Sequence, residues 1–214
     1  MSIETTLYER ARGIAEALAD PAELAVLCAV WGRQLAGSLG RGGRLLAAGN
    51  GGSAAQAQHL TAELVGRFRA DRRPFSAIAL HADTSTTTAI GNDYGPQEVF
   101  ARQVEAHGRP GDIVLLMSTS GRSPNITAAG RRARSLGLDL WCMTGPGPNP
   151  LSGLSDRRLC VDSADTATIQ EVHLVALHLM CEALDLALAD GDRAAAGRDA
   201  GSELNDRAGR AAVR

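Results

Sequence analysis

The segment RLLAAGNGGS, residues 44–53, decides the fold class. It opens with a short apolar run, continues through a glycine-rich stretch, and leads into residues 53–65, which carry apolar side chains at helical spacing. This order predicts a strand, a tight turn and a helix. A continuously apolar strand that leads into a helix is typical of a parallel sheet with both faces buried.

The same pattern recurs along the chain and predicts one α/β domain over residues 1–190. Further strands are predicted at residues 75–80, 112–117, 138–144 and 158–161. Helices are predicted at residues 3–19 and 21–39, from about residue 124, and at residues 168–188. Residues 191–214 lack apolar periodicity, and we expect them to form a flexible C-terminal tail.

Composition excludes several classes of protein. All 22 basic residues are arginine, so a Schiff-base aldolase, a pyridoxal-phosphate enzyme and a Walker A phosphate loop are excluded, because each needs a lysine. The net charge of −2 gives no electrostatic reason to expect nucleic acid or a membrane surface as a partner. The polar N-terminus does not resemble a signal peptide, and no apolar run reaches the ~18 residues of a membrane span.

The cysteines indicate a reducing compartment. None of the four has CxxC spacing, and three lie in apolar surroundings typical of buried thiols. We therefore expect reduced structural thiols in a cytoplasmic protein. These cysteines are Cys28, Cys142, Cys160 and Cys181.

Residues 118–123, STSGRS, are the strongest candidate for a binding site. Four of these six residues carry hydroxyl groups, and they follow an apolar strand directly and precede a helix N-terminus. Ligands bind at the carboxyl ends of parallel strands, and backbone amides with a helix dipole can hold a phosphate without any lysine. The alternative is a turn that only caps the helix, which serine and threonine also favour.

His59 and Glu63 are the candidate reactive pair. They follow the loop of Asn50, Gly51, Gly52 and Ser53, whose glycines allow close approach of a ligand. The spacing of four places both side chains on one helix face, where they can bind a divalent metal, act as an acid/base pair, or form an ordinary surface pair. His178 stands in an apolar helical run and becomes a candidate only together with that pair.

Four separated motifs in conserved order resemble the SIS-domain phosphoheptose isomerases. They are AAGNGGSAAQAQHLTAEL (47–64), AIGNDYG (89–95), STSGRSPN (118–125) and IQEVHLVALH (169–178). The resemblance implies a three-layer sandwich with a five-stranded parallel sheet, assembled as a homotetramer with sites between subunits. It also implies conversion of sedoheptulose 7-phosphate to D-glycero-D-manno-heptose 7-phosphate, the first step toward activated heptose.

The resemblance carries site residues over to matching positions of this chain. It implies a zinc site made by His59, Glu63, Gln170 and His178, and all four positions hold the expected residue. It implies contacts with the sugar phosphate from the following residues: Asn50, Gly51, Gly52, Ser53, Glu63, Asn92, Asp93, Ser118, Thr119, Ser120, Ser123 and Gln170.

The expected reaction is a ketose–aldose exchange through an enediol. It needs a base that carries a proton between adjacent carbons and a group that stabilises the developing oxyanion. We assign Glu63 as the base and His178 as the acid, with zinc polarising the oxygens. A carboxylate bound to zinc is a weaker base, so either Glu63 leaves the metal when substrate binds or the metal is partly structural.

Two alternatives belong to other classes: a SIS-domain factor that binds the bacterial replication initiator, and a regulator that senses a phosphosugar. The first is expected to lack the Glu and the second His of the metal set, whereas Glu63 and His178 are both present here.

Two observations bear on assembly. Gln170 and His178 lie eight residues apart, ~12 Å along one helix, which two ligands of one zinc span only with stretched side chains or with help from a second chain. The helix at 21–39 carries a broad apolar face that a partner subunit could cover, or that could simply cover its own sheet. This face includes Leu24, Val26, Leu27, Cys28, Val30, Trp31 and Leu35, with Leu18 beside it.

Overall fold

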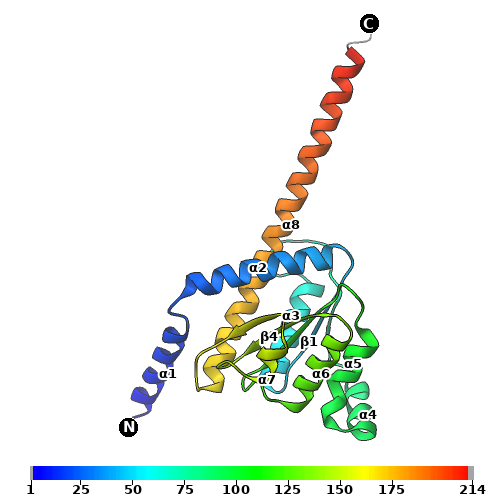
Figure 1. The fold of residues 1–214 in the computed structure, drawn as a ribbon. Helices are drawn as coiled ribbons and strands as arrows, with labels where there is room; N and C mark the ends of the chain where they lie inside the picture. The colour runs from blue at the N-terminus through cyan, green and yellow to red at the C-terminus, as the bar shows by residue number, and fades with distance from the viewer. Residues whose placement is uncertain (1, 212–214) are drawn as a thin grey trace.

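The computed structural model describes the backbone of residues 2–211 and the side chains of residues 2–191. Five parallel strands form one sheet in the order β2-β1-β3-β4-β5, with helices on both faces (Figure 1). The strands are β1 (Leu45–Ala48), β2 (Ala77–Ala79), β3 (Ile113–Ser118), β4 (Asp139–Thr144) and β5 (Arg157–Cys160). This arrangement confirms the predicted three-layer α/β fold.

The helices fill both outer layers of the sandwich. They are α1 (Ile3–Ala17), α2 (Pro21–Gly40), α3 (Gly52–Val65), α4 (Thr84–Tyr94), η1 (Pro96–Glu98), α5 (Val99–His107), α6 (Pro124–Ser135), α7 (Pro150–Leu154) and α8 (Thr166–Ala211). The side chains of α2, α3 and α8 form one core with the sheet, and those of α5, α6 and α7 form a second core on the other face.

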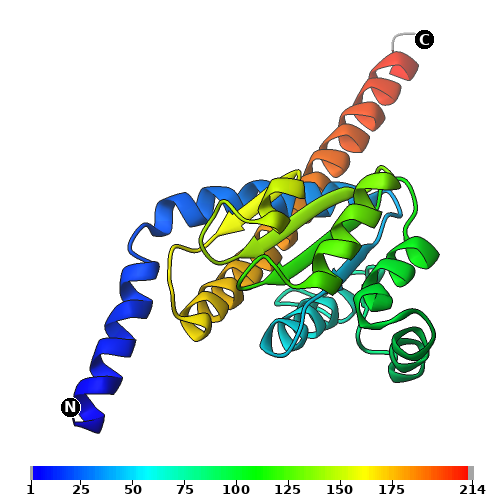
Figure 2. The same ribbon diagram turned by 60° about the horizontal axis from the view of Figure 1, so that its bottom comes forward.

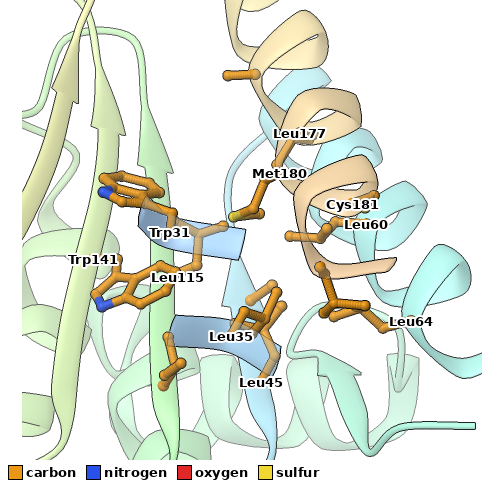
Figure 3. Close-up of a cluster of buried hydrophobic side chains, with 14 of the residues drawn as sticks. Trp31, Leu35, Leu45, Leu60, Leu64, Leu115, Trp141, Leu177, Met180 and Cys181 are labelled. Atoms are coloured by element: carbon orange, nitrogen blue, oxygen red, sulfur yellow. The ribbon is translucent and has the colours of Figure 1, made fainter. Parts of the chain in front are cut away.

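The larger core holds α2, α3 and α8 against one face of the sheet (Figure 3). The rings of Trp31 on α2 and Trp141 on β4 lie 5.0 Å apart between centroids. Leu60 on α3 and Leu177 on α8 are almost completely buried nearby. This packing fixes α3 and α8 relative to each other, and these two helices carry the candidate reactive side chains.

The sequence patterns missed α4, η1, α5 and α7. The sequence of α4 is rich in β-branched threonine and contains Gly91, both of which lower helix propensity. Its N-terminus is nevertheless capped, because Asp83 accepts a hydrogen bond of 3.1 Å from the Thr86 amide. Capping and tertiary packing outweigh the weak propensity of this segment.

The last helix is longer than predicted. The backbone of α8 continues in helical conformation to Ala211, away from the body of the domain (Figures 1 and 2). Most of the expected tail lies outside the residues with described side chains, so its flexibility stays a prediction. The part from Thr166 to Gly191 is long and apolar enough to cross a membrane by length and composition alone, with a mean hydropathy of 1.6. In the fold it is a core helix, with Ala176, Leu177 and Leu184 fully or almost fully buried.

The apolar face of α2 is largely covered within its own chain. Cys28, Trp31 and Leu35 are buried in the larger core, so this part of the face gives little support to the predicted oligomer. Val26 on the same helix remains 67% exposed. Helix α1 has no buried residue, and its Ile3 and Leu7 are 76% and 61% exposed. Exposed apolar side chains therefore lie on both leading helices.

Candidate active site

The two candidate loops lie side by side at the switch point of the sheet. The chain passes from β1 to β2 on one side and then to β3 on the other. Ala48 pairs in register with Leu116, so the loops that follow β1 and β3 leave the same edge of the sheet. Such a crevice is the usual ligand site of an open parallel sheet.

The loop after β3 is shaped to hold an anion. Gly121 has a φ of +61°, a conformation that glycine adopts without strain, and its amide donates to the Ser118 carbonyl at 2.9 Å. The Ser123 side chain does not cap α6; its hydroxyl lies 3.1 Å from the Ser118 hydroxyl. The capping interpretation of the Ser123 side chain is therefore wrong; the Ile126 amide in the first turn is bonded instead to Asn125 Oδ1 at 3.0 Å.

The loop after β1 is joined to the loop after β3 by a pair of amides. Asn50 donates to Asn125 Oδ1 at 3.0 Å, and Asn125 donates to Asn50 Oδ1 at 2.9 Å. Gly51 has a φ of +53°, which turns the backbone into α3. Sequence reasoning assigned no role to Asn125, although its place just after Pro124 at the start of a helix could have indicated one.

His59, Glu63 and His178 meet within one chain. His59 Nε2 lies 2.9 Å from His178 Nε2 and 3.5 Å from Glu63 Oε1. Phe68 stacks on the His178 ring, with centroids 5.7 Å apart. A hydrogen bond between the two rings requires one Nε2 to carry a proton and the other to accept it. The two histidines can therefore share a proton, and Glu63 lies close to the same nitrogen of His59.

The spacing of four from Glu63 predicts Arg67 on the same face of α3, but the structure contradicts this prediction. The helix ends at Val65, and the Arg67 side chain turns to the Arg69 carbonyl at 2.9 Å.

Gln170 lies at the other end of α3 from His178. A Cβ placed on Gly52 would come within 2.7 Å of the Gln170 side-chain amide, so the missing side chain of Gly52 is what admits Gln170. Gln56 Nε2 donates to the Gln170 carbonyl at 2.5 Å. Gln170 thus stands beside the loop after β1, and no second chain is needed to bring His178 to His59. The reach argument concerned Gln170 and His178, which do not meet in this arrangement, so it stays a prediction.

His59, Glu63, Gln170 and His178 have the ligand atoms that zinc accepts, but the four side chains do not surround a common point in this structure. Among residues 2–191, no three His, Cys, Asp or Glu side chains form a ready metal-binding cluster. Two imidazole nitrogens bound to a tetrahedral zinc at ~2.0 Å lie ~3.3 Å apart. The rings of His59 and His178, 2.9 Å apart at Nε2, would have to separate slightly, and the Gln170 side chain would have to leave Gly52.

Asn92 and Asp93 lie on α4, which follows β2 at the same edge of the sheet. Asn92 Nδ2 donates to Asp93 Oδ1 at 2.8 Å. Both residues stand more than two turns along α4 and are exposed. Nothing in the described contacts joins them to the two loops, so their contact with substrate stays a prediction.

A buried layer supports the phosphate loop from below. The Gly145 amide donates to the Thr119 carbonyl at 2.9 Å, and the Leu151 amide donates to the Gly121 carbonyl at 3.0 Å. The Asn149 side chain fills the space where a Cβ of Gly121 would lie. Sequence reasoning missed Asn149; its signal is a helix-capping asparagine within the run Gly-Pro-Gly-Pro-Asn-Pro.

The buried titratable groups are structural. His173 is fully buried and donates from Nε2 to the Thr144 carbonyl at 3.2 Å; burial lowers its pKa to about 4, so it stays neutral. All four cysteines are free, and Cys28, Cys142 and Cys181 are buried as predicted, whereas Cys160 is exposed. Burial raises the pKa of Cys28 to about 11, which leaves an unreactive thiol.

The fold and the arrangement of the two loops define the class of protein: an α/β domain with a five-stranded parallel sheet whose glycine- and serine-rich loops meet at the switch point. A model of the SIS domain family matches residues 6–145. The chain belongs to the SIS domain family, and within it to the phosphoheptose isomerases, which its curated relatives and solved structures single out.

Among those relatives, a phosphoheptose isomerase of Streptomyces coelicolor is 65% identical over 172 residues, which cover 80% of this chain and 74% of that protein. A solved phosphoheptose isomerase of Francisella tularensis superposes with a TM-score of 0.80 at 34% identity, covering 87% of this chain and all of that one. The enzyme of Neisseria gonorrhoeae gives a TM-score of 0.75 at 38% identity, covering 86% and 96% of the two chains. These comparisons confirm the resemblance inferred from the sequence.

Proposed function

We propose that the chain isomerises sedoheptulose 7-phosphate to D-glycero-D-manno-heptose 7-phosphate through an enediol. The observation that carries this proposal is the meeting of His59, Glu63 and His178 within one chain. Relatives up to 65% identical are phosphoheptose isomerases, which supports the same reaction.

Glu63 acts as the base and His178 as the acid. An enediol forms when a base removes the proton from one carbon while an acid protonates the neighbouring oxygen. The base then delivers a proton to the neighbouring carbon, and the acid takes one back from the hydroxyl on the first carbon, so both groups end each turnover in their starting protonation state. His59 lies near both groups and can orient them.

The loop after β3 holds the phosphate as a remote handle. Loop amides and the hydroxyls of Ser118, Ser120 and Ser123 lead into the N-terminus of α6. Thr119 belongs to the same loop. Asn50 approaches it through the amide pair with Asn125, and Gly51 and Ser53 lie next to Asn50 in the chain. Binding the phosphate here fixes the sugar so that its reacting carbons reach the neighbouring helix pair.

Zn²⁺ is proposed as the cofactor, held by His59, Glu63, Gln170 and His178, with the Gln170 side chain moving away from Gly52. Glu63 and His178 would act as base and acid only when they are released from the ion. When bound, the ion would polarise the hydroxyl and carbonyl oxygens of the sugar. Metal analysis of purified protein tests this, together with the activity after treatment with a chelator and after zinc is restored. A metal-free protein at full activity would contradict the proposal.

A homotetramer is proposed as the assembly. The support is the exposed apolar face of α1, with Leu7 at 61% and Tyr8 at 65% exposure. Asn92 and Asp93, which lie apart from the loops of their own chain, could serve a neighbouring site. Cytoplasmic location and the absence of nucleic-acid and membrane partners stay predictions. Light scattering measures the assembly; a monomer would contradict it.

The variant Glu63→Gln tests the catalytic assignment. The change is nearly isosteric and removes the base, so turnover should fall ~100-fold or more. Glu182→Gln is the matched control, because Glu182 is an α8 carboxylate paired with exposed Arg69 rather than with the histidines. A folded Glu63→Gln protein with wild-type activity would refute the assignment and favour a non-catalytic SIS-domain factor.

A further inference from the structure

Arg72 and Asp185 form a buried ion pair behind the reactive side chains. Arg72 Nε donates to Asp185 Oδ1 at 3.0 Å, and the two side chains are only 9% and 11% exposed. The guanidinium also lies over the Phe75 ring, 5.0 Å from its centroid. Burial of a charged pair at this depth is costly unless further hydrogen bonds accompany it.

Those further bonds go to the end of α3. Arg72 Nη2 donates to the carbonyl of Glu63 at 2.7 Å, and Nη1 donates to the carbonyl of Leu64 at 3.0 Å. The last carbonyls of a helix have no partner within the helix, so Arg72 supplies one for them. The residue that it holds by the backbone is the proposed base itself.

Asp185, the partner of Arg72 in this ion pair, lies on α8. It lies seven residues, or about two turns, beyond His178 and therefore on the same face of that helix. One guanidinium thus joins the backbone of Glu63 to the helix that bears His178. The distance between the Glu63 and His178 side chains, which must act together, depends on this link between the two helices.

We propose that the Arg72–Asp185 pair is a positioning element of the isomerase, which sets the register of α3 against α8 and so the meeting of Glu63, His59 and His178. This inference rests on the proposed function. It assigns neither residue to substrate: each acts through the helices that it ties together. Misplacement of reacting groups by about 1 Å can cost a factor on the order of 100 in rate.

The test uses the double variant Arg72→Met/Asp185→Leu. A single substitution would strand one buried charge and unfold the protein for that reason alone, whereas removal of both charges leaves an apolar pair of similar size. Arg69→Ala is the matched control, because Arg69 joins the same loop to Glu182 on α8 through an exposed ion pair of 2.7 Å. Circular dichroism and thermal melting establish that each variant is folded.

Two results are expected together. The kcat of the double variant falls at least 10-fold while KM changes less than about 2-fold, and its crystal structure shows His59 Nε2 and His178 Nε2 farther apart than 2.9 Å by on the order of 1 Å. Arg69→Ala changes neither. A folded double variant with kcat within 2-fold of the wild type, or with an unchanged separation, overturns the proposal. If the wild type itself does not isomerise the substrate, the proposed function fails. The distance between His59 Nε2 and His178 Nε2 in the double variant then decides by itself whether the Arg72–Asp185 pair is a positioning element.

Discussion

Gly52→Ala tests the place of Gln170 in the substrate site. The new Cβ would lie 2.7 Å from both Nε2 and Oε1 of Gln170, against the 3.4 Å at which ordinary contact begins. The Gln170 amide must therefore move by ~0.7 Å, the difference between these distances. Because the obstacle is the end of a flexible side chain, the fold should tolerate the change, and helix propensity favours alanine over glycine here by ~1 kcal/mol.

The displaced amide should weaken binding and orientation of the sugar. We expect kcat/KM to fall on the order of 10-fold, which is ~1.4 kcal/mol of transition-state stabilisation, with an unchanged melting temperature. Gly40→Ala at the end of α2 is the control, because nothing lies within 4 Å of its new Cβ. Steady-state kinetics on both variants decides. Gly52→Ala activity within 2-fold of the wild type would refute a substrate role for Gln170.

Three other predictions follow from contacts in the structure. His178→Ala should remove activity and zinc together; survival of both would make His178 an ordinary packed histidine with only a stability cost. Ser120→Ala and Ser123→Ala should raise KM more than they lower kcat, because the phosphate is remote from the reacting carbons, and the reverse pattern would place this loop at those carbons. His173 has a folded pKa of about 4 against 6.5 unfolded, so its contribution to stability is complete above pH 6.5 and is lost as the pH falls toward 4, by up to ~3 kcal/mol. Denaturant titrations of the wild type and His173→Leu should show a different slope of unfolding free energy against pH. Equal slopes in the two proteins would exclude this contribution.

The fold could be predicted because its central strands are continuously apolar. Residues 113–118 and 139–144 are buried along almost their whole length, so no polar alternation obscured the parallel sheet. Helix α4 was missed because its stability comes in part from a cap at Asp83, which gives no periodic signal in the sequence. Helix α5 does place Val99, Phe100 and Val104 at helical spacing, but it is only nine residues long.

The site was predicted in its residues more than in its arrangement. Spacing placed His59 and Glu63 on one face, but the meeting of His59 with His178 depends on how α3 packs on α8, which no local pattern records. The side-chain amides of Asn50 and Asn125 and the Arg72–Asp185 pair were missed for the same reason. Each of these joins residues that are close in space and distant in sequence.

The most direct test of the account is the reaction of the wild-type protein with sedoheptulose 7-phosphate, followed by proton NMR in heavy water. The account predicts that an aldose 7-phosphate appears, and that deuterium enters it at carbon 2, where a proton shared with solvent returns to the enediol. Purified, folded protein that binds the ketose phosphate and yields no aldose phosphate would contradict the central claim.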